Sequence, residues 1–539
     1  MMKRSIWKLT AIAAAILMTT GGCAVRTAGT EKQASAESAV EDMELRDAVS
    51  SALDEKDVNV ASAENYSTSE TASTIMSELF SDRDLSGDYD TNGACVIRLN
   101  GDSVTVEGSG AEADGSTIRI SAKGVYIVSG MLKDGQILVD AGEEKVQIVL
   151  SGADITNNDS ACIFVKSADK VFVTLADGTE NRLADTAQDY VQTDDESTVD
   201  AVIFSKDDLT INGNGTLSVK AGYKHGIVSK DDLKITGGEI TVVAANGKGL
   251  QGKDSVRIGG GTIDITAGTE GIEGLEIDIA GGELVVKAKD DGLNAANKED
   301  DGTTEKEGFG MMADTDENCR IRISGGSLSV NAEGDGLDSN GYLIVEGGTV
   351  IVDGPENDGN GALDAGIDVS ITGGTVIATG SGGMAETFGR NSTQYSLQVY
   401  FDETLGGGTT VILADENGTE ILTATPTKKY SSVVFSSPEL TEGNYTVYAG
   451  DQTVEVQISE ISTSVGNGGF GPGGSGFGGP GRQNGDPAGM PDGQKPDFGD
   501  GQTPTQMPDG QKPDFGDGQT PPQMPDGQKP DFGNERKKR

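Results

Sequence analysis

Acidic and amide side chains recur at two fixed positions in the middle of this chain of 539 residues. Both positions are defined by an aliphatic residue that follows a glycine in a short loop. The residue two places before this aliphatic residue, which we call the first row, reads His225, Lys248, Glu270, Asp291, Asp335 and Gly361. The residue just after it, the second row, reads Val228, Gln251, Glu273, Asn294, Asp338 and Asp364. If the repeats stack, each row becomes a line of neighbouring side chains.

The chemistry that such rows predict is cation binding. Stacked strands lie about 4.8 Å apart, and carboxylates at that spacing repel unless a cation lies between them or one takes up a proton. Calcium takes roughly six to eight oxygen ligands from carboxylates, amides, backbone carbonyls and water, which these loops offer. The predicted calcium ligands are Glu270, Glu273, Asp290, Asp291, Asn294, Asp335, Asp338 and Asp364. The alternative is a solvated acidic edge, or Asn and Asp residues that serve turn geometry.

Glycine pairs, each followed by a β-branched alternation, indicate the elements that position these rows. The pairs are Gly237-Gly238, Gly260-Gly261, Gly281-Gly282, Gly325-Gly326, Gly347-Gly348 and Gly373-Gly374. Their second glycines lie 23, 21, 44, 22 and 26 residues apart. A period of about 22 residues with short β-runs predicts an all-β fold, a parallel β-helix with one coil per repeat.

Three segments depart from this period. Residues 298–318 double one interval and lack a strand pattern, so they predict a long loop on one coil rather than a degenerate coil. Residues 384–465 contain short β-runs with turns and predict a small antiparallel β unit that closes the far end. The stretch Ile75–Phe80 predicts a helix that covers the open end of the solenoid, because an uncovered coil exposes core and strand edge.

The N-terminus has the features of an export signal. Lys3, Arg4 and Lys8 precede a short apolar stretch, and Cys23 follows two glycines as at a bacterial lipoprotein cleavage site. Lipid at Cys23 would anchor the protein to the outer face of a membrane, whereas ordinary cleavage would leave the cysteine incidental. The predicted domains are a signal peptide (1–22), a lipid-anchored flexible tether (23–72), a parallel β-helix with an N-terminal cap (73–383), a C-terminal β unit (384–465) and a disordered Gly/Pro-rich repeat tail (466–539).

Composition narrows the class of protein. The formal net charge is −46, aromatic residues make up 5% and glycine counts 79. A narrow solenoid core of Val, Ile, Leu and Ala fits this composition better than a conventional globular core. Since the chain has no cluster of basic residues besides the last four, Arg536-Lys537-Lys538-Arg539, we expect no nucleic-acid partner. Cys95, Cys162 and Cys319 are far apart in sequence, and we expect buried thiols.

Several strings resemble a bacterial family of exported carbohydrate-binding β-helix proteins. They are Ser205-Lys-Asp-Asp-Leu-Thr-Ile211, His225-Gly-Ile-Val-Ser-Lys-Asp-Asp-Leu233, Asp291-Gly-Leu-Asn-Ala-Ala296 and Tyr445-Thr-Val-Tyr-Ala-Gly450. The resemblance covers about residues 92–461. It implies a right-handed parallel β-helix that binds calcium, is similar to polysaccharide lyase family 9, and binds cellulose or pectic acid.

Catalysis is the weaker interpretation of the sequence. Lyases similar to that family remove a proton next to a uronate carboxylate, which requires calcium and a basic side chain. The nearest candidates for the base are Lys230, Lys248 and Lys253. None of them can be placed on the lyase motif, and the alternative for each is a surface lysine on a turn. The only histidine is His225, and no nucleophile–His arrangement is evident. We therefore predict no catalytic residue.

Sugar stacking would have to use Tyr or Phe, because the single tryptophan, Trp7, lies in the signal. Tyr223, Phe309 and Tyr342 are the predicted ligand-binding aromatics, with Phe388 a further candidate and core packing the alternative for each. Together these features predict a monomeric, calcium-dependent polysaccharide-binding lipoprotein on the bacterial cell surface. The alternatives are a calcium-dependent polysaccharide lyase acting on polyuronate, and a structural spacer or adhesin that calcium rigidifies.

Overall fold

The computed structural model describes residues 70–192, 198–297, 315–466 and 468. The chain divides into two units, Met1–Ser475 and Gly476–Arg539, and all described residues belong to the first. The predicted signal peptide, Cys23, most of the tether, Phe309 and the repeat tail lie outside the described residues. Among the described helices, none is long and apolar enough to cross a membrane.

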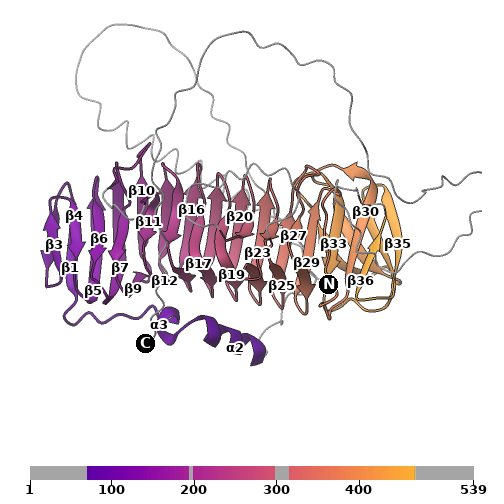
Figure 1. The fold of residues 1–539 in the computed structure, drawn as a ribbon, viewed down its shortest axis with the longest axis horizontal. Coiled ribbons are helices and arrows are strands. Elements are labelled where there is room, and N and C mark those ends of the chain that lie inside the picture. The colour runs from indigo at the N-terminus through magenta and orange to yellow at the C-terminus, as the bar shows by residue number, and fades with distance from the viewer. Residues whose placement is uncertain (1–69, 193–197, 298–314, 467, 469–539) are drawn as a thin grey trace, which may run out of the picture. The chain divides into compact units, whose positions relative to one another are not determined.

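The described part is all-β, as predicted, and its strands stack in parallel into a solenoid-like fold (Figure 1). Each coil contributes strands to up to three faces. The first face carries both rows of polar residues. In pairing order its strands are β4 (Thr117–Ile120), β6 (Gln136–Asp140), β8 (Ile163–Ser167), β11 (Ala201–Ser205), β14 (His225–Ser229), the start of β17 (Leu250–Ile258), the start of β19 (Ile272–Ile279), β21 (Leu293–Ala295), β24 (Leu337–Ser339) and β27 (Leu363–Ala365).

The other two faces follow the same order along the stack. The second face consists of parts of β1 (Cys95–Gly101), β5 (Gly124–Leu132) and β7 (Lys145–Asn157), then β9 (Lys170–Leu175), β12 (Leu209–Gly213), β15 (Asp232–Ile235), the ends of β17 and β19, β22 (Arg320–Ile323), β25 (Tyr342–Val345) and β28 (Asp368–Ile371). The third face continues from the end of β7 through β10 (Glu180–Asp185), β13 (Thr216–Ala221), β16 (Glu239–Ala244), β18 (Thr262–Ala267), β20 (Glu283–Ala288), β23 (Ser327–Ala332), β26 (Thr349–Asp353) and β29 (Thr375–Gly380).

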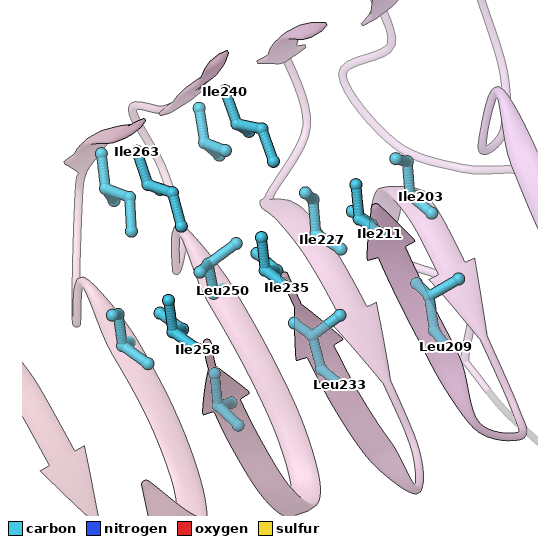
Figure 2. Packing of buried hydrophobic residues seen from close by; sticks show 14 of the residues in the cluster. Ile203, Leu209, Ile211, Ile227, Leu233, Ile235, Ile240, Leu250, Ile258 and Ile263 are labelled. Atoms are coloured by element: carbon cyan, nitrogen blue, oxygen red, sulfur yellow. The ribbon is translucent and has the colours of Figure 1, made fainter. Parts of the chain in front are cut away.

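Aliphatic side chains that point inward from all three faces form the core. Ile203, Ile227 and Leu250 occupy one register line of the first face, and each is fully buried. Figure 2 shows these residues beside the matching isoleucines and leucines of the other faces. Fully burying one such side chain contributes about 1.5–3 kcal/mol, so stacking supplies the stability that a single coil lacks.

The repeated glycines have two different structural reasons. The second glycine of each pair has a positive φ, which only glycine adopts readily. These φ values are 95° at Gly238, 97° at Gly261, 93° at Gly282, 80° at Gly326, 79° at Gly348 and 90° at Gly374. The loop glycines before Ile227, Leu250, Ile272, Leu293 and Leu337 instead allow close packing. At Gly292 a Cβ would lie 2.3 Å from Cγ1 of Val330 and 2.5 Å from the carbonyl oxygen of Gly336.

The doubled interval is an insertion in one coil. β19 pairs with β22, β20 with β23 and β21 with β24, so no coil intervenes between these neighbours. The prediction of a loop rather than a hidden coil is therefore confirmed, although residues 298–314 themselves lie outside the described part. The handedness of the solenoid stays a prediction.

The N-terminal helices do not occupy the expected place. Helix α2 (Glu70–Leu79) and the short α3 (Asp82–Leu85) are present, which confirms a helix at Ile75–Phe80. However, α3 packs on β12, in the middle of the second face, rather than on the open end. Asp84 is 1% exposed there, and its carboxylate accepts a hydrogen bond from Thr210 at 2.7 Å and pairs with Lys170 at 2.8 Å. The helices therefore lie on the flank of the solenoid, where Asp84 has its polar partners. The prediction that they cover the open end is wrong.

Antiparallel strands lie at both ends of the stack. At the N-terminal end, β2 (Val104–Glu107) pairs with β1, and β3 (Ala111–Asp114) pairs with β4. At the other end, β33 (Tyr430–Ser436) pairs antiparallel with β29 and with β30 (Ser396–Leu405), and β36 (Ser462–Val465) adds to β30. A separate sheet contains β32 (Glu420–Ala424), β31 (Val411–Asp415), β34 (Gly443–Ala449) and β35 (Gln452–Ile458).

Candidate functional site

The two rows inferred from the repeat are neighbouring lines on the first face. In the second row, successive strands pair Val228 with Gln251, Gln251 with Glu273, Glu273 with Asn294, Asn294 with Asp338 and Asp338 with Asp364. In the first row, the backbone carbonyls of Lys248, Glu270, Asp291, Asp335 and Gly361 each accept from a glycine N–H of the preceding coil. Parallel strands in register place equal repeat positions side by side, so both rows are real lines of side chains.

Three predicted ligands form a compact group of carboxylates. Oxygens of Asp291, Asp335 and Asp338 all lie within 4.8 Å of one another, and each residue is half-buried. Backbone N–H groups help to orient them. The N–H of Asp335 donates to Asp291 Oδ1 at 2.7 Å, and the N–H of Gly361 donates to Asp335 Oδ1 at 2.5 Å. Three carboxylates this close are the type of ligand set that a divalent cation takes in proteins.

Asn294 adds an amide oxygen to this group. Its side chain is only 6% exposed, and its Nδ2 donates to Asp291 Oδ2 at 3.4 Å. Its Oδ1 is buried and has no hydrogen-bond partner. Because a buried polar atom without a partner costs about 1–3 kcal/mol, an orphaned oxygen beside three carboxylates fits a cation that would be its missing partner.

The pKa values of carboxyl groups here are raised by burial first and, at Asp335, by neighbouring carboxylates second. Burial raises the pKa of the Asp335 carboxyl to about 8, against the lowering effect of the Gly361 N–H, and the neighbouring carboxylates raise it further. Burial also raises the pKa of Asp364, which is next in the second row. Without a cation these carboxyl groups therefore hold protons that an isolated aspartate would have lost.

Glu386 extends the acidic row and was not predicted from the sequence. Burial raises its pKa to about 7, with the Asp364 carboxylate the next cause. Its Oε2 accepts from the N–H of Ala365 at 3.2 Å, which places this carboxylate beside β27. The segment around it lacks the repeat pattern, which left no signal by which sequence could find it.

Other predicted ligands have different surroundings. Glu273 is 3% exposed in its side chain and forms an ion pair with Lys248, while Gln251 Nε2 donates to the same carboxylate at 2.9 Å. Its charge is thus compensated within the protein rather than by the aspartate group. Glu270 is 7% exposed, and Asp290 is exposed at the rim. Neither belongs to the three-carboxylate group among the described residues.

The three candidate lysines separate into two environments. Lys248 belongs to the ion pair with Glu273. Lys230 and Lys253 instead line a shallow depression beside the second row, where Gln251, Glu273 and Asn297 also contribute to the lining. Lys230 Nζ lies 5.9 Å from the centre of the Phe204 ring. The depression therefore extends from Lys253, two coils before Asn294, to Ala296 and Asn297, which follow Asn294 in the chain.

The predicted aromatic contacts receive mixed support. Tyr223 is half-buried and packs against Tyr190, with 4.8 Å between ring centroids. Tyr342 is half-buried on the second face, between Arg320 and Asp368, and not on the face that carries the acidic rows. Phe388 is 1% exposed and belongs to the core, so the packing alternative is correct for it. Cys95, Cys162 and Cys319 are buried free thiols, as expected.

Similarity to known proteins covers part of this region. Residues 114–305 match a family described as "Carbohydrate-binding domain-containing protein". A protein of that description from Acetivibrio thermocellus is 44% identical over 148 residues, which is 27% of this chain and 50% of the relative. The chain thus spans about half the length of that relative. The matched residues are similar to carbohydrate-binding domains and include Asp291 and Asn294 but not Asp335 or Asp338.

A solved structure gives a further likeness. The gadolinium derivative of a polysaccharide lyase-like protein from C. thermocellum is 34% identical, over 52% of this chain and 93% of that chain. The TM-score is 0.35, which does not establish a shared fold.

Proposed function

We propose that this protein is a cell-surface polysaccharide-binding protein whose binding depends on calcium and proceeds without catalysis. The observation that carries the calcium part is the group of Asp291, Asp335 and Asp338 beside the unpartnered oxygen of Asn294. The family match of residues 114–305 supports a carbohydrate as the ligand. Right-handed coiling, export and a lipid anchor at Cys23 belong to the same proposal and rest on the sequence.

Different residues of the first face would bind the calcium ion and the sugar. The three aspartates and Asn294 would hold a calcium ion through oxygen atoms, which is the ligand chemistry that calcium prefers. A bound calcium would supply an open position for a sugar hydroxyl or carboxylate. Because the whole chain carries a net charge of −46, an acidic glycan would otherwise be repelled at long range. The remaining second-row side chains, Gln251 and Asp364, would contact the sugar beside the ion.

The test is titration of the protein with polygalacturonate, first with calcium and then with a chelator. Calorimetry reports binding, and ultraviolet absorbance of the solution reports unsaturated product. Calcium-dependent heat without new absorbance is the expected result. If the chelator leaves sugar binding unchanged, the calcium mechanism is wrong. If calcium raises the melting temperature but no glycan binds, the protein is a spacer that calcium rigidifies.

A lyase is the second candidate, and the depression favours it specifically. Lys230 and Lys253 lie in the lining of that depression, which extends to Ala296 and Asn297 just after β21, and a base for a calcium-held uronate would have to approach from this side. Rising absorbance in the same titration would establish this activity. Loss of that signal in Lys230→Ala or Lys253→Ala, but not in Lys220→Ala on the third face, would identify the base.

A further inference from the structure

Along one register line of the first face, the side chains change from apolar to polar. Strand pairing continues the second row backwards from Gln251 to Val228, Phe204, Phe164 and Leu138. The line is therefore apolar over the earlier coils and polar or acidic from Gln251 onward. All these side chains point away from the core, since they alternate with the buried isoleucines and leucines.

The apolar part of this line is covered by another segment of the chain. Ala187, Tyr190 and Val199 form one hydrophobic cluster with Phe164, Phe204 and Val228, all of them buried. The cover is fixed in place by polar contacts. The Tyr190 hydroxyl donates to the buried carboxylate of Asp185 at 2.9 Å, and the Gln192 side chain exchanges hydrogen bonds with the backbone of Val199. Two layers of protein thus lie over the core on the earlier coils.

The cover ends where the depression begins. Val228 is fully buried, whereas Gln251, its partner on the next coil, is half-buried and lines the depression. Lys230 lies at this boundary, because its ammonium group is above the covered Phe204 and also in the lining of the depression. Val191, on the covering segment, is 58% exposed. A glycan chain that follows the second row from Asp364 toward Gln251 would meet a step at this place.

We propose that the cover blocks the binding face at one side, so that the protein captures the ends of polysaccharide chains rather than their interior. This inference rests on the proposed polysaccharide binding along the first face. The depression with Lys230 and Lys253 is the subsite for the terminal sugar, and its lysines suit an anionic group on that sugar. The line from Gln251 to Asp364 comprises five rungs, or roughly 19 Å at the strand spacing. Glu273 and Asn294 within it are buried, so this span sets the length of chain that can lie along the line, not the number of side chains in contact.

The experiment compares intact polygalacturonate with the same mass of the polymer after partial depolymerisation, both titrated into the full-length protein with calcium. Chain-end capture predicts that the number of binding sites per mass of polymer rises in proportion to the number of chain ends. It also predicts that affinity stops rising with oligomer length once the rungs are filled. An unchanged number of sites per mass overturns the inference and leaves the proposed function standing. No binding of either sample overturns both.

A pair of variants tests the terminal subsite without disturbing the core. Lys253 is exposed, and Lys253→Ala should weaken binding of short oligomers about five-fold, the effect of one exposed charge contact. Lys220, which is exposed on the third face, is the matched control, and Lys220→Ala should leave the affinity unchanged. Equal affinities of the two variants for short oligomers would contradict the placement of the terminal sugar in the depression.

Discussion

Asn294 shows at the residue scale why this part of the first face fits a cation. A carboxylate there would add charge to a group that already repels itself, and an aliphatic residue would remove a ligand. The amide supplies an oxygen without a charge, and its Nδ2 group helps to orient Asp291. The buried oxygen without a partner is what separates this group from an acidic surface patch.

Asn294→Ala should lower calcium affinity about tenfold, because it removes one ligand from the group and loosens Asp291. In the presence of a chelator its melting temperature should stay close to that of the parent protein, since the lost oxygen has no partner within the protein. Calcium titration followed by calorimetry checks both statements. Asn246→Ala, on an exposed turn, is the control. Equal calcium affinities of the two variants would show that Asn294 is not a calcium ligand.

Asp335 should make the calcium-free protein less stable as the pH rises. Its folded pKa, about 8, lies above the ordinary value of 3.8, so the folded state binds more protons than the unfolded state between these values. Stability is therefore fully present below about pH 4 and is lost progressively as the pH approaches 8. Calcium should reverse the loss at high pH. Thermal unfolding with a chelator across this range measures the slope.

Asp335→Asn is the variant that isolates this effect. The amide does not titrate, so the fall of melting temperature between pH 4 and pH 8 should become clearly shallower. A slope identical to that of the parent protein would show that Asp335 does not hold a proton in the folded state.

At the scale of the element, a tight loop positions each pair of polar residues. The glycine that precedes the aliphatic residue allows the chain to approach the next coil closely, so the aliphatic side chain enters the core. The side chains on either side of this dipeptide then point away from the core, as those of the half-buried Asp291 and the buried Asn294 do around Gly292 and Leu293. Core packing and ligand geometry therefore depend on the same backbone conformation.

Gly292→Ala should damage both stability and calcium binding. Its Cβ would lie 2.3 Å from Val330 Cγ1 and 2.5 Å from the Gly336 carbonyl oxygen, so the loop must shift at a cost of about 1–3 kcal/mol. Denaturant unfolding and calcium titration measure the two effects. Gly406→Ala should change neither, because a Cβ there meets open space. Wild-type calcium affinity in Gly292→Ala would show that the loop position is not critical.

At the scale of the whole molecule, one short N-terminal segment fastens several coils together. Around α3, Arg83 donates to Gln147 of β7 at 2.5 Å, and the Asn212 amide of β12 donates to the backbone of Ser86 at 2.9 Å. Thr236, which follows β15, donates to the carbonyl of Asp84 at 2.5 Å. In a solenoid each coil otherwise contacts only its neighbours, so these contacts couple coils that would unfold separately.

Asp84→Asn should weaken this coupling by up to roughly 3–5 kcal/mol, because it leaves the buried Lys170 with only the more distant Asp208 carboxylate, at 3.8 Å, as a described anionic partner. The pKa of Asp84 is lowered despite burial, chiefly by Lys170, so the parent protein should lose the same stabilisation as the pH falls below about 4. Limited proteolysis and calorimetry should show earlier unfolding of the N-terminal coils. Asp82→Asn, exposed on the same helix, should behave as the parent protein. A single unshifted transition in Asp84→Asn would contradict the coupling.

The sequence alone determined the features that repeat. A period of about 22 residues predicted parallel stacking, and stacking placed Asn294 beside Asp338 and Asp338 beside Asp364 without any knowledge of side-chain positions. Equal positions in successive coils must be neighbours in space, because strands in register repeat the same backbone path. For this reason the rows and the inward aliphatic residues were predictable.

Only the tertiary structure decided the features that do not repeat. Glu386 reaches the acidic row from a segment outside the period. Tyr190 belongs to the cluster that covers Phe164, Phe204 and Val228, and Asp84 holds the N-terminal helix on the flank instead of the open end. Each of these contacts joins a non-repeating segment to the stack. Its place depends on burial and charge partners far away in sequence, which a periodic pattern does not encode.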